Sequence, residues 1–438
     1  MVKPWRYALG EFALGLPGTI VQGYMLYYFN HDLGLTAGYV AIAKVFQAIW
    51  DGVNDPLVGH LSDRTRSRWG RRRPWLTVGA VLYLIFSVAA FFVPGGIRSE
   101  GGALFAYYLT LALLWETAAT VSWIPYNSLL PTLFPTEQSR IHTQTYKMVI
   151  YMIAQIVGFT ATPILIQMMP FGYVSLIYAV LSGVTLFGLL YGLKEPPAEP
   201  LQADEPGFFV SVLATLKYRT YQFYLITHAF FHLTVTILLG AMAFYAEYSL
   251  HLKGWQTSAM FGSVFLATMP GMALWARVAR RTGTPRAFSA SLLLFAVAIG
   301  TLGIVPDLWT GVAAGVLIGL TMAGFLVLGD VTIARIADRD HELTGLRREG
   351  MFFSVPWVLT RIANVLQAGC FVLLSVMFGY VSGDQPGPNP GAAFRFMMGA
   401  IPFVGLSLAF LASLGLHAAF RREEQGGSPA TPNSVPAR

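Results

Sequence analysis

Three charged side chains interrupt an apolar stretch at residues 37–61, and their types and spacing suit cation chemistry. Lys44, Ala48, Asp51 and Asp55 stand at positions i, i+4, i+7 and i+11, so a helix places them in one stripe along one face. Two ionised carboxylates about one turn apart repel each other in a low dielectric, and a bound cation or a proton relieves the repulsion. The stripe therefore predicts a monovalent-cation site; a polar face packed against other helices is the alternative.

Pro56 adds a second ligand type beside these acids. It cannot donate a hydrogen bond to the carbonyl of Gly52, so we expect a kink that frees this backbone oxygen. Carboxylates and a carbonyl together suit a hard cation.

The composition places these charges in a membrane protein. Of the 438 residues, 55% are hydrophobic and 12% are charged, whereas soluble domains carry about 25% charged residues. There is no Walker loop in the sequence, which argues against an ATP-driven pump. The single cysteine, Cys370, excludes an intramolecular disulfide and lies in an apolar stretch.

Hydropathy predicts an all-α membrane protein with twelve spans in two groups of six. The expected spans are 8–30, 37–61, 74–95, 102–131, 142–166, 171–193, 220–247, 256–279, 287–305, 309–336, 350–379 and 392–420. Residues 1–193 and 220–420 would form the two bundles. A Pro-rich, acidic stretch at 194–219 reads as a cytoplasmic linker, and residues 421–438 as a disordered tail.

The distribution of basic residues orients the chain. Six arginines lie within ten residues, directly between two spans, where such a cluster fixes a cytoplasmic loop rather than a nucleic-acid site: Arg64, Arg66, Arg68, Arg71, Arg72 and Arg73. Among the loops and ends, the side opposite the termini receives only Arg98, Lys253 and Arg395. Both termini are therefore expected in the cytoplasm.

The end of the second span and this Arg-rich loop together resemble the sequence signature of a known family. The stretch WDGVNDPLVGHLSDRTRSRWGRRRPW resembles the signature of the glycoside-pentoside-hexuronide:cation symporters, the melibiose-permease group of the major facilitator superfamily. The resemblance implies the major facilitator fold in a bacterial inner membrane. It also implies a monomeric, non-enzymatic, cation-coupled secondary transporter of a glycoside, uronide or related solute. The coupling ion would be sodium or a proton, with no organic cofactor.

The resemblance also implies site residues. Asp51, Asn54, Asp55 and Thr120 would bind the cation, with a possible sodium held by the two acids; Thr120 falls where the family places a hydroxyl. The predicted solute-binding residues are Lys44, Trp123, Tyr126, Asn127, Lys147, Tyr151 and Arg361. Lys147 matches a family position that is commonly Arg; in an alternative register of the alignment, Tyr151 stands there. Arg361 matches a Lys that the family places beside its acids.

The chain departs from melibiose permeases where those proteins contact sugar. Their two sugar-binding acids correspond to Gly15 and Trp123, and a stacking Trp corresponds to Asn127. Losing acids and keeping cations favours an anionic or zwitterionic solute, with uronides the sugar-like option and lysolipids the apolar one. A transporter of lysolipids and a non-transporting receptor of the same fold are the rival functions, although a receptor needs neither acid of the pair.

Several other polar residues within spans have no assigned role. Glu11 is close enough to a predicted span end to snorkel, and for Lys147 snorkelling is the alternative to binding solute. Glu116 needs a partner or a proton. The spacing of His228 and His232 suits a metal pair, but no third ligand is near in sequence, so hydrogen bonding is favoured over zinc. Asp330 and Arg335 are five residues apart, so partners on other helices are as plausible.

The predicted topology is directly testable. A reporter that is active only in the cytoplasm, fused after Arg421 or inserted in the Arg64–Arg73 loop, should be active at both sites, because positive charge is retained on that side. Activity of a periplasm-specific reporter at either site would contradict it; the same reporters at Lys253 are the matched control.

Overall fold

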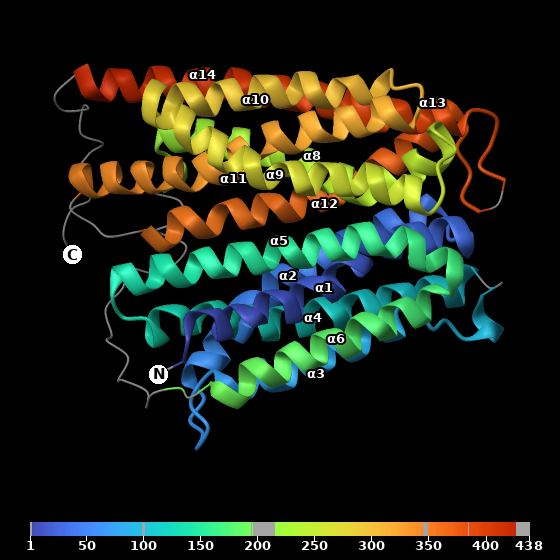
Figure 1. Cartoon of the computed structure of the whole chain (residues 1–438), viewed down its shortest axis with the longest axis horizontal. Helices are drawn as coiled ribbons and strands as arrows, with labels where there is room; N and C mark the ends of the chain where they lie inside the picture. The colour runs from blue at the N-terminus through green and yellow to red at the C-terminus, as the bar shows by residue number, and fades with distance from the viewer. Residues whose placement is uncertain are drawn as a thin grey trace.

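In a computed structural model of the chain, the described residues are 2–98, 101–193, 195, 215–344, 349–383 and 385–425, and among them there are helices and no strands. The helices run along one long axis (Figure 1). Their bounds are α1 Pro4–Tyr27, α2 Ala37–Arg64, α3 Arg73–Ala89, α4 Gly101–Leu133, α5 Glu137–Met168, α6 Phe171–Gly192, α8 Arg219–Phe244, α9 Trp255–Thr282, α10 Thr284–Gly300, α11 Leu308–Thr344, α12 Glu349–Phe378, α13 Pro390–Arg395 and α14 Ile401–Gln425. Short π-helical turns extend α1 as η1 (Tyr28–Asp32) and α8 as η3 (Tyr245–Ser249), and η5 (Phe396–Ala400) joins α13 to α14.

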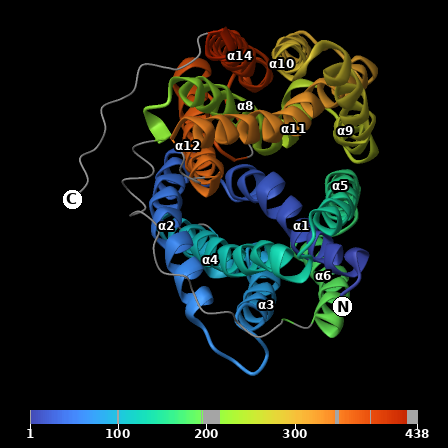
Figure 2. The same ribbon diagram turned by 90° about the vertical axis from the view of Figure 1, so that its left-hand side faces the viewer.

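The helices form two halves. Helices α1 to α6 make one half and α8 to α14 the other (Figures 1 and 2). Within the first half α1 packs on α5 and α6, and α3 packs on α4; within the second, α9 packs on α11 and α14 packs on α8 and α10. The halves meet where α1 contacts α8, α2 contacts α12 and α5 contacts α9.

Membrane-length helices account for most of the described chain. Nine of the described helices are long and apolar enough to cross a bilayer, and α3 is a shorter apolar helix. Helix α2, with Lys44, Asp51 and Asp55, is not among the nine. The count of twelve spans and the positions of the termini stay predictions. Residues 196–214 of the expected linker lie outside the described residues, and α14 continues to Gln425, past the predicted start of the tail.

Two acidic residues fix helix starts by accepting backbone hydrogen bonds. The carboxylate of Glu195, from the predicted linker, accepts from the N–H groups of Arg72 at 2.8 Å and Arg73 at 3.0 Å, where α3 begins. Asp307 caps α11 by accepting from the N–H groups of Trp309 and Thr310, both at 3.0 Å. These bonds, chiefly that from Thr310, lower the pKa of the exposed Asp307 carboxyl because they stabilise its charged form.

Helices α9 and α11 approach closely because glycine lies at their contact. A Cβ at Gly319 of α11 would lie 2.1 Å from the carbonyl oxygen of Val264 on α9, and one at Gly315 would lie 2.1 Å from Ser263 Oγ. Such close backbone contact is the usual way in which membrane helices gain packing energy without a hydrophobic driving force.

Polar contacts join the halves at the end remote from the start of α1. Tyr27 donates to the Glu247 carboxylate, and His31 Nε2 lies 3.6 Å from Glu247 Oε1. Asn30 receives a hydrogen bond from Tyr380 Oη and donates one to Ser382 Oγ, both at 2.6 Å. These contacts pair α1 and η1 with η3 and with the segment after α12.

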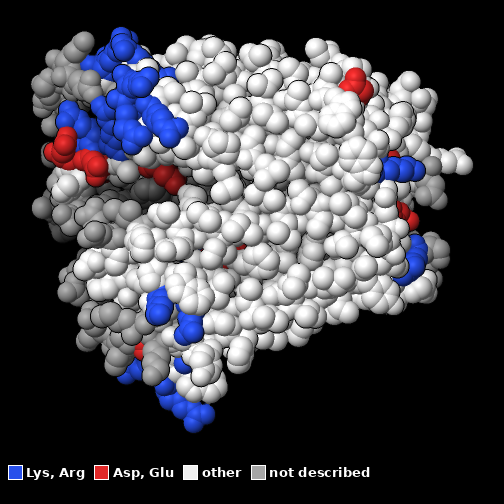
Figure 3. All heavy atoms as spheres, viewed as in Figure 1, with Lys and Arg blue, Asp and Glu red and all other residues white. Residues whose placement is uncertain are grey.

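Aromatic packing lies next to these polar contacts. Tyr24 packs against Phe261 with ring centroids 6.2 Å apart, and Phe159 stacks on Phe265 at 4.8 Å. Viewed from the opposite end, a gap lies between the ribbons of the two halves, with α2 and α12 on one side of it and α5 and α9 on the other (Figure 2), and the surface is hollowed between the halves near that end (Figure 3). The conformation is therefore closed at the end that we predict to face outward.

Removing the charge of Glu247 should loosen this closed end. Hydrogen bonds to charged groups contribute about 1.5–3 kcal/mol, so Glu247→Gln should raise the population open at this end. Ala246 is 1% exposed in this conformation. A cysteine placed there by Ala246→Cys, in a Cys370→Ala background, should then react several-fold faster with an impermeant maleimide in Glu247→Gln than in the protein that keeps Glu247. Glu342→Gln, which breaks an exposed ion pair with Arg339, is the matched control; an unchanged rate in Glu247→Gln would exclude a closing role.

Candidate functional site

A three-residue ion cluster joins the two halves. Arg361 on α12 lies between the two acids of α2: its Nε is 3.7 Å from Asp51 Oδ2, and its Nη2 donates to Asp55 Oδ2. Asp51 is 6% exposed. The i,i+4 spacing places both carboxylates on the face of α2 that meets α12, as the sequence predicted, and a single guanidinium bridges them.

The other two predicted cation residues lie near these acids. Thr120 on α4 donates to Asp55 Oδ1 at 2.9 Å, and Asn54 is buried beside them at 4% exposed. Within the described part of the chain, Asp51 Oδ1 and Asn54 Nδ2 are buried without a hydrogen-bond partner. A buried carboxylate oxygen without a donor favours binding of a small cation or a proton. The structure thus brings the four predicted cation residues together.

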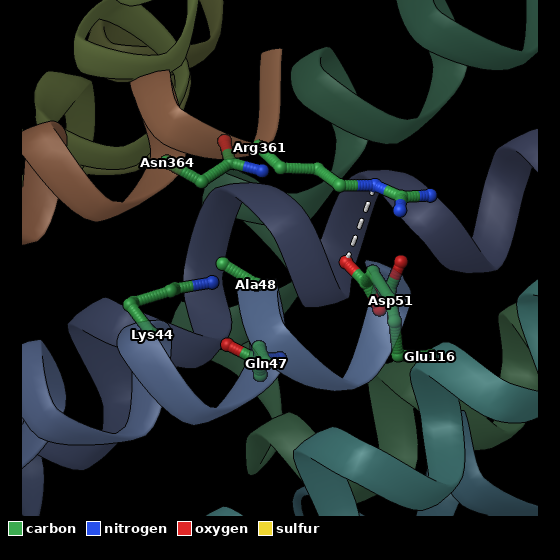
Figure 4. Close-up of a pocket in the computed structure, with 7 residues that line it drawn as sticks. All are labelled: Lys44, Gln47, Ala48, Asp51, Glu116, Arg361 and Asn364. Atoms are coloured by element: carbon green, nitrogen blue, oxygen red, sulfur yellow. Dashed lines mark ion pairs between the residues drawn. The ribbon is translucent and has the colours of Figure 1, made fainter. Parts of the chain in front are cut away.

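A small cavity adjoins the cluster (Figure 4). Its volume of about 30 Å³ is enough for a water molecule or a small ion and not for a sugar. The lining residues come from α2, α4 and α12: Lys44, Gln47, Ala48, Asp51, Glu116, Arg361 and Asn364. Lys44 and Arg361 were both predicted to bind solute. In this conformation Arg361 is part of the ion cluster, and Lys44 lines the cavity that adjoins it.

Glu116, which had no assigned partner from sequence, shares this cavity with Lys44. The two side chains reach it from different helices, α4 and α2 (Figure 4). Their charges are opposite, so each reduces the cost of burying the other. Gln47 and Asn364 also line the cavity and were not predicted, because single amides in apolar spans carry no distinctive spacing.

A second ion pair lies within the first half. Lys147 Nζ on α5 is 3.1 Å from Glu11 Oε1 on α1 and donates to Asn127 Oδ1 on α4 at 2.8 Å. The Lys147 ammonium also lies 4.7 Å from the ring centroid of Tyr126. Glu11 and Lys147 are 7% and 4% exposed, so the expectation that Glu11 snorkels at the membrane boundary is wrong, as is the snorkelling alternative for Lys147; each neutralises the other inside the bundle.

The three predicted aromatic residues differ in exposure. Tyr126 has 0% exposure, stacks on Tyr7 at 4.8 Å and donates to the Tyr7 carbonyl at 3.0 Å, so in this conformation it packs the core. Trp123 is half-buried and meets Tyr126 edge to face. Tyr151 is 36% exposed. A Cβ at Gly15 would lie 3.6 Å from the Tyr151 ring, so α1 and α5 meet at the position where melibiose permeases carry an acid.

The remaining polar residues are in the second half. The rings of His228 and His232 are 4.2 Å apart, and His228 Nε2 lies 3.4 Å from Thr360 Oγ1. Within the described ranges, no group of three or more His, Cys, Asp or Glu side chains could hold a metal ion. The sequence left the partner of Arg335 open. In the structure, its guanidinium carbon lies 4.7 Å from the ring centroid of Phe420 on α14.

Two helical halves with buried ion clusters, one of them between the halves, define a membrane protein of the major facilitator class. The family model described as "MFS/sugar transport protein" matches residues 6–419, so the chain belongs to that family.

Relatives that match over most of the length of this chain include two bacterial proteins. The isoprimeverose transporter of Lactiplantibacillus pentosus is 24% identical over 94% of this chain and 88% of its own. The glucuronide carrier protein homolog of Escherichia coli is 24% identical over 93% of this chain and 91% of its own. An uncharacterized symporter of Synechocystis sp. is 28% identical over a shorter stretch, 44% of this chain and 38% of that protein.

A solved structure supports the fold. The inward-facing, unoccupied form of a bacterial homolog of the human lysosomal transporter Spinster superposes with a TM-score of 0.69. The match covers 98% of this chain and 100% of that one at 13% identity, so it supports the arrangement of helices alone.

The Glu11–Lys147 pair gives a measurable coupling. Glu11→Gln or Lys147→Met alone leaves one buried charge unpaired and should cost about 3–5 kcal/mol, seen as a lower unfolding temperature in detergent. The double variant should be more stable than the sum of the single losses predicts. The exposed Arg339–Glu342 pair, 2.6 Å apart, should give near-additive losses in the same cycle; additivity at Glu11 and Lys147 would contradict a buried pair.

Proposed function

We propose that this protein is a secondary transporter that moves a sugar-like solute together with a monovalent cation. The observation that carries the proposal is the bridge from Arg361 to both Asp51 and Asp55 across the boundary between the halves. Two acids share the single positive charge of Arg361 there, so one further cation can bind without giving this group of residues a net positive charge.

The coupling cation would act by competing with Arg361. A sodium ion or a proton at Asp51 and Asp55 weakens the hold of these acids on the guanidinium, and the link between α2 and α12 loosens. Thr120 and Asn54 can then supply further oxygens to a sodium ion, whereas a proton needs neither. Coupling follows if the cation binds one state of the halves more tightly than the other.

The solute would bind next to this bridge, in the space between the halves. Lys147, Asn127 and Glu11 offer a polar group that can bind hydroxyls, and the half-buried Trp123 and the exposed Tyr151 offer aromatic faces. A full-length relative named for isoprimeverose and another named for glucuronides support a glycoside or uronide. Both Lys147 and Arg361 already have acidic partners, so a uronide carboxylate would have to compete with Glu11, Asp51 or Asp55.

Uptake into proteoliposomes tests the proposal. Under an imposed sodium or proton gradient, the wild type should accumulate a glycoside or a uronide, and the effective gradient identifies the ion. Asp51→Asn and Asp55→Asn should each abolish uphill accumulation while downhill exchange continues, because Asn keeps an oxygen and loses the charge.

Two controls separate coupling from folding and substrate choice. Glu342→Gln, on the exposed end of α11, should retain wild-type accumulation. Arg361→Lys keeps the charge but loses the planar fork, so it should reduce uronide uptake more than uptake of a neutral glycoside. Undiminished accumulation in both Asp variants would make the carboxylates structural. Transport of lysolipids alone, or binding with no transport, would support the two rival functions.

A further inference from the structure

A pocket at one end of the second half collects positive charge away from the central ion cluster. We call it the basic pocket. It has a volume of about 220 Å³ and lies between the ends of α9, α11 and α14 and the start of α10. Its lining residues are Thr282, Pro285, Arg286, Arg335, His417, Phe420 and Arg421. This volume is large enough for a polyatomic ion.

The charge of this pocket has one sign. Arg286, Arg335 and Arg421 reach it from three different helices, and none of its lining residues is acidic. Arg280 and Arg281 in the last turn of α9 add further positive charge nearby. Basic side chains are gathered over this end of the molecule (Figure 3). Three guanidinium groups close together raise the local positive potential, which attracts an anion.

The pocket also presents oriented hydrogen-bond donors. The guanidinium of Arg335 lies on the Phe420 ring at 4.7 Å, and this contact holds the planar fork beside the pocket. Such forks match the oxygens of phosphate in bidentate fashion.

The start of α10 adds a second kind of attraction for an anion. The helix begins after Gly283, which has φ +85°, and no side chain caps its first turn. The N-terminus of this 17-residue helix lies at Pro285 and Arg286, both pocket residues. Helix N-termini attract anions through their free N–H groups and their dipole.

The pocket lies where lipid head groups are expected. It is formed by the ends of the membrane-length helices α9, α10, α11 and α14, on the side that sequence places at the cytoplasm. Basic pockets between helices on this side of a membrane are suited to the phosphates of anionic lipids.

We infer that the basic pocket binds a phosphate group, with the head group of an anionic phospholipid as its source. The ligand is separate from the transported solute and cation, because the pocket shares no residue with the cavity at Asp51. The inference therefore does not depend on the proposed function.

Lipid retention by the full-length protein tests this inference. The wild type, in detergent with phosphatidylglycerol or phosphatidylcholine, should retain phosphatidylglycerol preferentially in native mass spectrometry. Arg286→Gln and Arg335→Gln should each weaken that retention about tenfold, as expected for loss of a hydrogen bond between charged groups. Arg277→Gln, on α9 outside the pocket, removes the same charge and should leave retention unchanged.

A second measurement identifies the source of the phosphate. Thermal unfolding is followed in phosphatidylcholine nanodiscs, with phosphatidylglycerol or with inorganic phosphate added. A rise in unfolding temperature with phosphatidylglycerol that is lost in Arg335→Gln supports the lipid. A rise with inorganic phosphate alone overturns the lipid source and keeps the phosphate site. Equal retention by the wild type, Arg286→Gln and Arg335→Gln, with no stabilisation by either additive, overturns the inference.

Discussion

The bridge from Arg361 to Asp51 and Asp55 is the interaction on which the arrangement depends. Two carboxylates and one guanidinium lie at the contact of α2 with α12, and burying them is costly unless each charge finds a partner. Apolar residues of the same volume would pack these helices at least as well. The bridge therefore fixes how the two halves meet in this state, and in the proposed mechanism the coupling cation would compete with Arg361 for the two acids.

The helical periodicity of α2 was readable from the residues alone, whereas its partner Arg361 was indicated only by the family resemblance. Four residues at i, i+4, i+7 and i+11 must share a face of a helix, so the stripe on α2 was predicted from spacing alone. Thr120 was placed by resemblance and indeed donates to Asp55. The contact between Asp55 and Arg361 joins residues more than 300 positions apart, and periodicity within one helix carries no information about it.

Glu11 and Lys147 show a different limit of sequence reasoning. Both are within about three turns of a helix start, which made the membrane boundary the simplest expectation. In the structure α1 packs along α5, so the two helices bury their opposite charges against each other. The residues predicted to bind solute therefore lie in two separate places. Arg361 and Lys44 line the cavity at the two acids of α2, whereas Lys147 and Asn127 lie at the ion pair with Glu11.

The glycine contact between α9 and α11 has a mechanical consequence. At Gly319 the backbone of α11 lies against the backbone of α9, and at Gly315 only the small Ser263 side chain lies between them, so this helix pair is stiff against sliding. Most contacts between the halves are aromatic rings, polar groups and the Arg361 bridge, which tolerate reorientation better than touching backbones do. The two halves can therefore move most easily at the contact between them. The rigid pair of α9 and α11 carries a small displacement there to the far ends of both helices.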